Sequence, residues 1–158
     1  MSLELRSFRP ADLGAVVRLF TDTVHHINAA DYPPAQLRVW APERPDLELW
    51  QERLEGACVW VAEVAGEIVG FAALGARGRL GLLYAHRLWQ GKGIGSALLA
   101  QVEAEARRRG AVLLFVRASV TARPFFEHKG FRMLGERWVR REGLALRSYE
   151  MAKPLGPP

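Results

Sequence analysis

A glycine-rich stretch in the middle of the chain has the residue types needed to bind a phosphate group. Its sequence is Gln90-Gly91-Lys92-Gly93-Ile94-Gly95-Ser96. Glycines leave successive backbone N–H groups unscreened and adopt positive φ angles without steric cost, so such a turn can direct several amides toward one anion. A helix that begins directly after the turn adds its own unpaired N–H groups and the positive end of its dipole. Together with the mobile charge of Lys92, these groups predict a phosphate-binding turn, with a pyrophosphate as the favoured ligand.

Two common phosphate-binding motifs do not fit this stretch. A Walker A loop requires Ser or Thr directly after its lysine, whereas Gly93 follows Lys92. The dinucleotide fingerprint requires Gly or Ala where this chain has Ser96. It also requires an acidic residue about 20 positions further on, where the chain has the apolar run 112–116. The stretch therefore belongs to neither of these motifs.

Length and composition predict one compact domain. The chain has 158 residues, 49% of them hydrophobic, which is enough for a sizeable core. No apolar run approaches the length of a membrane span, and the N-terminal residues lack the apolar centre of a signal peptide. The single cysteine, Cys58, excludes an internal disulfide and a cysteine metal cluster. We therefore expect one domain over residues 1–154, a disordered tail over 155–158, a cytoplasmic setting, no membrane partner and no metal.

The net charge of +5 raises the question of nucleic-acid binding. The densest basic cluster, Arg107-Arg108-Arg109, ends a predicted helix, where cations meet the negative end of the helix dipole. The other basic residues are scattered, with no interleaved aromatic residues. We expect the charge to serve solubility and the attraction of a polyanionic coenzyme. Nucleic-acid binding is an alternative supported by net charge alone, and no nucleic-acid partner is expected.

Hydrophobic periodicity predicts the elements that position the glycine-rich turn. Strands are predicted over residues 3–8, 58–64, 68–74, 80–84, 112–116, 131–139 and 144–152. Helices are predicted from residue 10 to about residue 30, over 35–40, between 45 and 56, from 94 to 110 and over 121–129. The run 112–116 is continuously apolar, which predicts a strand buried on both faces. This order of elements differs from a doubly wound dinucleotide fold, in which strands and helices alternate from the start.

Two motifs give the chain a resemblance to the GNAT superfamily of N-acetyltransferases. The glycine-rich turn meets the pattern (Q/R)-x-x-G-x-(G/A) of the acetyl-CoA loop, directly after a predicted strand and at the start of a helix. The stretch 119–131 is similar to the N-x-x-A-x-x-x-Y-x-x-x-G-F segment of many members, with Ala122 and Gly130 in matching places. Ser119 and Phe126 depart from that segment, because Asn and Tyr are usual there. The order of elements also resembles the GNAT fold, so the resemblance covers almost the whole chain.

The resemblance implies a mixed α/β (α+β) fold, with a largely antiparallel sheet of about seven strands and helices on both faces. It implies acetyl-CoA as cosubstrate. In GNAT folds the strand before the loop and the next parallel strand splay apart, and pantetheine fills the gap by pairing with the first. The residues implied to bind the coenzyme are Leu82, Leu83, Tyr84, Gln90, Gly91, Lys92, Gly93, Ile94, Gly95, Ser96, Ser119, Arg123 and Phe126.

The implied activity is transfer of the acetyl group of acetyl-CoA to a primary amine of a small molecule or peptide, directly in a ternary complex. Such transfer needs a neutral amine, a polarised thioester carbonyl and a stabilised thiolate, and positioning supplies much of this. A backbone N–H on the strand before the loop can polarise the carbonyl. The alternative function is a coenzyme-A-binding regulatory domain without transfer activity. We expect a monomer or a homodimer.

The candidate catalytic residues are Tyr84 and Phe126. Phe126 occupies the tyrosine position of the family, so we expect it near the coenzyme sulfur, but it cannot protonate the leaving thiolate. Either water or another side chain does so, or Phe126 is ordinary core and the chain does not catalyse transfer. Tyr84 is the nearest hydroxyl by its place in the sequence, although a tyrosine at a strand end commonly serves packing. Ser119 lacks a histidine–acid pattern and is expected to contact the coenzyme.

The acceptor amine is expected to enter opposite the coenzyme, between the end of the first helix, the segment 31–40 and the last two strands. By resemblance, GNAT acceptors often meet the N-terminal helices there. The candidate acceptor-binding residues are His25, His26, Asp31, Tyr32 and Trp40. Aromatic walls and one carboxylate would suit a cationic amine. Adjacent helical histidines point about 100° apart, so both cannot face one pocket. Tyr32 and Trp40 could instead simply pack the helices onto the sheet.

Overall fold

The structure, a computed structural model, describes residues 2–157. Seven strands form one sheet in the order β1-β2-β3-β4-β5-β7-β6. The strands are β1 (Leu3–Ser7), β2 (Cys58–Val64), β3 (Glu67–Leu74), β4 (Arg79–Ala85), β5 (Leu113–Ser119), β6 (Arg132–Arg141) and β7 (Leu144–Pro154). Among these strands only β4 and β5 pair in parallel. The mixed, largely antiparallel seven-stranded sheet expected from the sequence is therefore confirmed.

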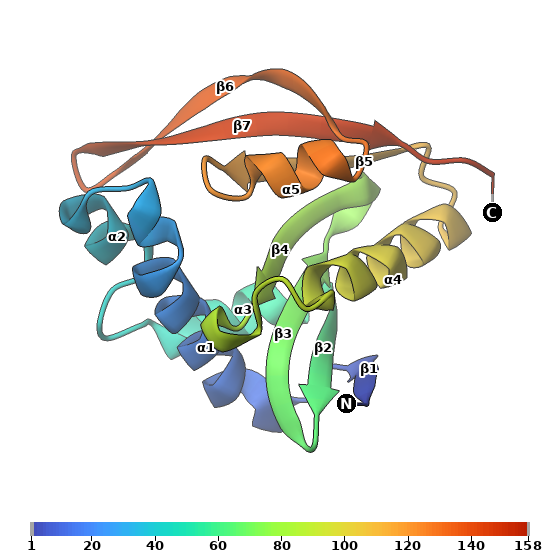
Figure 1. Cartoon of the computed structure of the whole chain (residues 1–158), viewed down its shortest axis with the longest axis horizontal. Helices are drawn as coiled ribbons and strands as arrows, with labels where there is room; N and C mark the ends of the chain where they lie inside the picture. Colours follow the sequence, from blue (N-terminus) through green and yellow to red (C-terminus); the bar gives the residue numbers. More distant parts are fainter. Residues whose placement is uncertain (1, 158) are drawn as a thin grey trace.

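Helices cover both faces of the sheet, as expected (Figure 1). They are α1 (Leu13–His26), α2 (Pro34–Trp40), α3 (Leu47–Glu55), α4 (Ile94–Arg108) and α5 (Arg123–His128), with 3-10 turns η1 (Pro10–Asp12), η2 (Asn28–Ala30), η3 (Ala76–Gly78) and η4 (Arg87–Trp89). The side chains of α4 and α5 pack in one core, and α4 lies in front of the sheet in Figure 1. Those of α1, α2 and α3 pack in a second core on the opposite face. No helix within residues 2–157 is both long and apolar enough to cross a bilayer.

The position of α4 decides where the glycine-rich turn is held. Its buried residues include Ile94, Leu98 and Val102, which recur at the spacing of one helix face. Gly70 on β3 lets this face approach closely, because a Cβ there would lie 2.6 Å from Cγ2 of Ile94. The first turn of α4 therefore lies directly on the sheet, beside the end of β4.

Two expectations about local structure were wrong. The helix expected to reach about residue 30 ends at His26, and the separate turn η2 follows it. The run 112–116 is not buried on both faces, since Leu113 is 37% exposed while its neighbour Leu114, on the other face of the strand, is fully buried. The core under α1, α2 and α3 holds no residue of β5, so the second face of this strand has no helix packed on it.

The end of the chain is held more firmly than expected. Leu155 donates its N–H to the carbonyl oxygen of Val112 at 2.8 Å, and its side chain packs against the core under α4. This residue is therefore fixed against the sheet, although the sequence predicted a disordered tail over 155–158. Pro158 lies outside the described residues.

Candidate active site

The parallel strands β4 and β5 separate in the middle of the sheet. They pair only through Arg79 with Phe115 and Leu80 with Val116. Beyond this point β4 pairs only with β3, and β5 pairs only with β7. In Figure 1, β7 and β6 run across the top of the view, whereas β4 runs down toward α1. Along residues 82–85, backbone N–H and C=O groups on one side of β4 therefore have no partner strand, and an extended ligand could pair with them.

A bulge marks the start of this gap. Leu80 is paired with Leu74 and Leu82 with Ala73, so Gly81 is an extra residue in β4. The bulge reverses the direction of the following side chains, because residues of a strand alternate between its faces. Leu80 accordingly packs in the core under α4, and Leu82 packs in the core under α1. Leu82, Leu83 and Tyr84, which the resemblance assigns to the coenzyme, lie along the open side of β4.

The glycine-rich turn has the backbone geometry that the sequence predicted for an anion site. Gly91 and Gly93 have φ angles of 72° and 82°, in the left-handed region. Gly93 is the N-cap of α4, and no side chain caps the helix. A Cβ at either glycine would meet no atom within 4 Å, so the space over the turn is open. The N–H groups of the first turn of α4, which includes Ile94, Gly95 and Ser96, face this open space without acceptors inside the helix.

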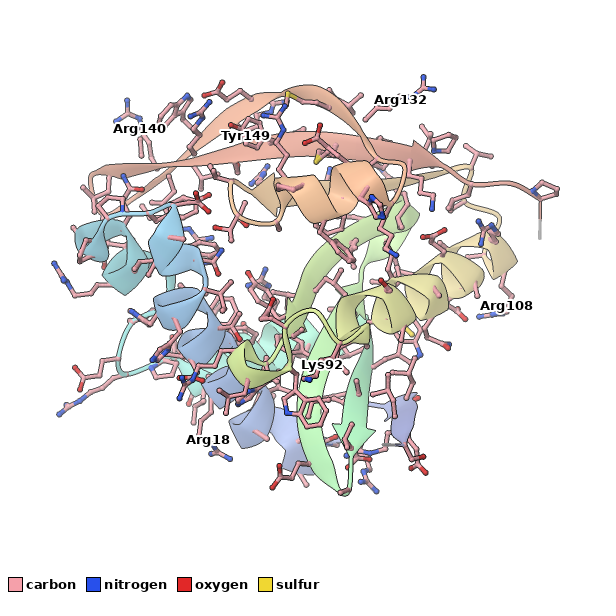
Figure 2. All side chains as sticks on the ribbon, in the orientation of Figure 1. Arg18, Lys92, Arg108, Arg132, Arg140 and Tyr149 are labelled. Carbon is pink, nitrogen blue, oxygen red and sulfur yellow. The ribbon has the colours of Figure 1, made fainter. Side chains whose placement is uncertain are left out.

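Side chains brace the turn against the strand and the first helix. The side-chain amide of Gln90 donates to the carbonyl oxygen of Ala85 at 2.8 Å, so it points back toward β4. Arg87 donates to Asp22 of α1 at 2.8 Å. Lys92 is exposed at the turn, in front of the sheet in Figure 2. The neutral side chain of Gln90 and the ion pair of Arg87 thus orient the turn. Lys92 is not used for this purpose and is available to a ligand.

Two candidate coenzyme-binding residues at and after the end of β5, Ser119 and Arg123, form interactions with other protein groups. The hydroxyl of Ser119 accepts from the N–H of Ala122 at 3.0 Å, so it caps the turn before α5. Arg123 places its guanidinium 4.5 Å from the ring centroid of Tyr149 and donates to Glu127. Ser119 thus stabilises the turn that precedes α5, and Arg123 is oriented along α5.

Phe126 lies in the core under α4. It is 3% exposed, and its ring centroid lies 5.2 Å from that of Phe125 and 5.0 Å from that of Phe131. Tyr84 belongs to the core on the opposite face of the sheet. The two candidate catalytic residues are therefore on different sides of the sheet.

A cavity of about 580 Å³ lies on the face of the sheet that carries α1, α2 and α3. Its wall is built from these helices and from β4, β5, β6 and β7, so it opens where β4 and β5 separate. Tyr32, Trp40, Tyr84 and Ser119 all contribute to the wall. The volume is within the usual range for small-molecule sites, which is roughly 300–1,000 Å³.

Three of the five candidate acceptor-binding residues do not line the cavity. The ring of His25 donates from Nε2 to the carbonyl oxygen of Ala41 at 2.6 Å, so it ties α1 to the end of α2. His26 is exposed and contacts the carbonyl oxygen of Asp22. Asp31 is also exposed. Tyr32 and Trp40 are the two that the structure brings to the cavity.

Tyr32 joins three elements of the cavity wall. Its hydroxyl donates to the carbonyl oxygen of Arg147 on β7 and accepts from the N–H of Val120 at 2.9 Å. Burial raises the pKa of Tyr32, although the hydrogen bond from Val120 acts in the opposite direction. The segment between α1 and α2 is thereby fixed to the ends of β5 and β7.

Tyr84 presents a neutral hydroxyl to the cavity. Its ring centroid lies 4.9 Å from that of Phe20 and 5.6 Å from that of Phe71. Burial raises the pKa of Tyr84 to about 12, because it disfavours the phenolate, while the charge of Arg53 and a hydrogen bond with the Trp40 side chain act in the opposite direction. Tyr84 can therefore donate a hydrogen bond near neutral pH but cannot act as a phenolate base.

This pKa predicts a loss of stability at alkaline pH. The pKa of Tyr84 is 10.0 in the unfolded chain and about 12 in the folded protein. As pH rises, Tyr84 ionises first in the unfolded chain. The contribution of neutral Tyr84 to the free energy of unfolding is therefore complete below pH 10 and is lost between pH 10 and about 12. Denaturant unfolding across this window should show a steeper fall for the wild type than for Tyr84→Phe. Parallel curves for the two proteins would contradict the raised pKa.

Sequence reasoning missed the charged part of the cavity wall. Its arginines are Arg53 on α3, Arg79 on β4, Arg117 on β5, Arg141 on β6 and Arg147 on β7. These residues are scattered along the chain and belong to no motif, so no local signal distinguishes them from other surface arginines. Among the described residues, no group of three His, Cys, Asp or Glu side chains is placed to hold a metal ion.

Comparisons with known proteins agree with this geometry. The model of the acetyltransferase (GNAT) domain family matches residues 28–153, a range that includes the glycine-rich turn and the gap between β4 and β5. Among curated proteins, the chain is similar to the uncharacterised N-acetyltransferase YafP of Escherichia coli K12. The two are 28% identical over 151 residues, which cover 95% of each chain.

Solved structures have the same fold. A GCN5-related N-acetyltransferase from Rhodopseudomonas palustris is similar with a TM-score of 0.94 and 30% identity, over 98% of this chain and 97% of that chain. The PaiA N-acetyltransferase of Thermoplasma acidophilum, solved in complex with coenzyme A, has a TM-score of 0.79 and 20% identity. That comparison covers 98% of this chain and 99% of the other, and it concerns the fold alone.

Proposed function

This chain belongs to the GNAT family of acetyltransferases, and on that premise we propose that it moves the acetyl group of acetyl-CoA to a primary amine of a small molecule or peptide. The observation that carries the proposal is the gap between β4 and β5. The open glycine-rich turn follows the end of β4, and the cavity opens at the same gap on the face of α1, α2 and α3. Coenzyme and acceptor can therefore be bound together, which supports direct transfer in a ternary complex.

The coenzyme would be held mainly by backbone groups. Its pyrophosphate would accept hydrogen bonds from the amides of the turn 90–96, with Lys92 as a secondary contact. The pantetheine arm would run along the unpaired side of β4 and pair with the backbone at Leu82, Leu83 and Tyr84. A backbone N–H on this strand would also polarise the thioester carbonyl. The acetyl group would then lie in the gap, within reach of the cavity.

The proton balance of the reaction gives Tyr84 a role. The amine nitrogen attacks the acetyl carbon, the bond from carbon to sulfur breaks, the nitrogen loses a proton and the sulfur gains one. The Tyr84 hydroxyl would receive the proton from nitrogen while giving its own proton to sulfur. No free phenolate forms in such a relay, which suits a residue whose pKa is raised to about 12. Water is the alternative carrier of this proton.

A Phe126→Tyr substitution tests the proposal that residue 126 lies beside the coenzyme sulfur. We expect the variant to keep its coenzyme affinity and to show a higher kcat, because a hydroxyl is added where the thiolate leaves. Because Phe126 is 3% exposed in the core, an added hydroxyl costs stability unless it reaches the gap, in which case unfolding by denaturant should be unchanged. A loss of about 1–3 kcal/mol, the cost of an unpaired buried hydroxyl, would instead place residue 126 in closed core.

Thiol release separates the proposed function from its alternative. The protein would be incubated with acetyl-CoA and a panel of primary amines, and free coenzyme A would be measured with a thiol reagent. Coenzyme affinity would be measured separately by calorimetry. Amine-dependent thiol release supports transfer. Coenzyme binding without release for any amine would favour a coenzyme-A-binding regulatory domain.

A further inference from the structure

The charges around the cavity indicate which amines it accepts. Building on the proposed function, we infer that the acceptor carries a carboxylate in addition to its amine, and that Arg53 and Arg141 bind this carboxylate. The acceptor class is therefore small aminocarboxylates, and not the cationic amines that the sequence suggested.

Three of the five arginines of the cavity wall are already paired within the protein, and Arg147 on β7 is paired with Glu136 at 2.9 Å. Glu150 on β7 accepts from Arg117 at 3.2 Å and lies 3.8 Å from Arg79. The side chain of Glu150 is 11% exposed, so this cluster is part of the sheet rather than a free surface group. One carboxylate thus serves both arginines of β4 and β5.

The other two arginines have no such partner. Within residues 2–157, neither Arg53 nor Arg141 forms an ion pair. Asp46 is the acidic residue on the cavity wall, and its carboxylate accepts from the N–H of Leu49 as the cap of α3. Asp31, the carboxylate proposed from the sequence, does not line the cavity. The wall is therefore left with unbalanced positive charge.

Arg53 and Arg141 line the same cavity, where their like charges are not balanced by an ion pair with any described residue. The guanidinium of Arg53 lies 5.6 Å from the ring centroid of Trp50, which fixes its position at the cavity. Partial burial lowers the pKa of Arg53, Tyr84 acts in the opposite direction, and the charge of Arg141 lowers the pKa. Two like charges that are held together without a counter-ion are unfavourable. An anion between them relieves this repulsion, and guanidinium groups match the two oxygens of a carboxylate.

The register of β6 shows why Arg141 and not its neighbour faces the cavity. Val139 is paired with Leu146 and Arg141 with Leu144, so Val139 and Arg141 share one face of β6. Val139 and Leu146 both line the cavity. Arg140 lies between them on the opposite face, and Figure 2 shows it at the outer end of β6. Arg140 is thus a matched control for Arg141.

The coenzyme does not account for these two arginines. Its phosphates are proposed at the turn before α4, whose side chains pack in the core on the other face of the sheet. The rest of the cavity wall includes the apolar residues Leu49, Trp50 and Val139. A ligand with an amine, a carboxylate and an apolar side chain therefore matches the aromatic and apolar surface as well as the charge.

Matched amines test the inference through the transfer reaction. Phenylalanine, leucine and methionine would each be compared with the corresponding amide and with the decarboxylated amine, by thiol release. We expect kcat/KM for the acids to exceed that for the amides by at least about tenfold, the value of one charge-assisted hydrogen bond. Arg53→Gln and Arg141→Gln should each raise KM for the acids by about tenfold, with unchanged coenzyme affinity. Arg140→Gln should leave these constants at their wild-type values.

Tryptophan fluorescence gives a second measurement that does not need catalysis. Trp40 and Trp50 line the cavity, so the same acids and amides can be titrated without acetyl-CoA. The inference is supported if the fluorescence changes saturably with an acid but not with its amide, and if this change is lost in Arg53→Gln and Arg141→Gln. It is overturned if no acid binds saturably, if amides bind equally well, or if Arg140→Gln has the same effect. If thiol is released with no preference for the acids, the inference is overturned and the proposed function stands. If no amine causes thiol release, the proposed function is overturned, and the fluorescence titration still tests whether the cavity binds the carboxylate.

Discussion

Coenzyme binding should be lost in a Gly93→Pro variant that remains folded. Gly93 has a φ of 82°, whereas proline fixes φ near −65° and removes the backbone N–H. The turn could no longer direct its amides at one point, and losing two charge-assisted hydrogen bonds corresponds to about 3 kcal/mol, or roughly two orders of magnitude in Kd. Proline keeps the carbonyl oxygen that accepts from Ala97 at 3.0 Å, so α4 can still begin at Ile94. Calorimetry with coenzyme A gives the affinity, and thermal unfolding by circular dichroism verifies the fold.

A pair of milder variants separates binding from backbone strain. Gly66, in the hairpin between β2 and β3, has a φ of 80° and the same open space around it as Gly93. Gly66→Ala and Gly93→Ala should therefore cost similar stability, and only the second should weaken coenzyme binding. Lys92→Ala should weaken binding by about 1 kcal/mol, as expected for an exposed charge. Unchanged coenzyme affinity in a folded Gly93→Pro protein would rule out the turn as the pyrophosphate site.

The open backbone geometry of the glycine-rich turn could be predicted from the sequence because its chemistry is local. Three glycines, a lysine and the start of a helix are contiguous, and the positive φ angles of Gly91 and Gly93 follow from residue type. The order of strands and helices was predictable for a similar reason, since each hydrophobic period lies within one element. Strand β2, for example, has the bounds that its apolar run predicted.

The cavity could not be predicted, because its wall comes from distant segments. Arg53 and Arg141 line the same cavity only because α3 packs against one face of the sheet and because the register of β6 places Arg141 on that side. Asp31 and Tyr32 show that even neighbouring residues can differ in a way that the sequence does not predict. Tyr32 turns inward to bond Arg147 and Val120, and its neighbour Asp31 is left in solvent. Composition identified both as candidates, but only the backbone direction at each residue decides which of them faces the cavity.

The fold itself depends on the hydroxyl of Tyr32, which makes it a useful reference for Tyr84. Tyr32→Phe removes the acceptor of the Val120 N–H and the donor to the Arg147 carbonyl oxygen. We expect a loss of about 1–3 kcal/mol in the free energy of unfolding, because buried backbone groups are left unpaired. Tyr84→Phe removes a hydroxyl on the cavity wall and its hydrogen bond with the Trp40 side chain, and no backbone group loses a partner, so its cost in stability near neutral pH should be smaller.

The kcat of Tyr84→Phe should fall by about a hundredfold, the lower range for loss of a positioned proton carrier. The phenylalanine keeps the ring contacts with Phe20 and Phe71, so the wall of the cavity and the coenzyme affinity should be unchanged. A fall in kcat without a change in coenzyme Kd distinguishes a role in the chemical step from a role in packing. Tyr32→Phe supplies the contrast, because it should lower stability and raise KM for the acceptor while changing kcat less. If Tyr84→Phe retains kcat within about twofold, water carries the proton between nitrogen and sulfur, and Tyr84 serves only to pack β4 against α1.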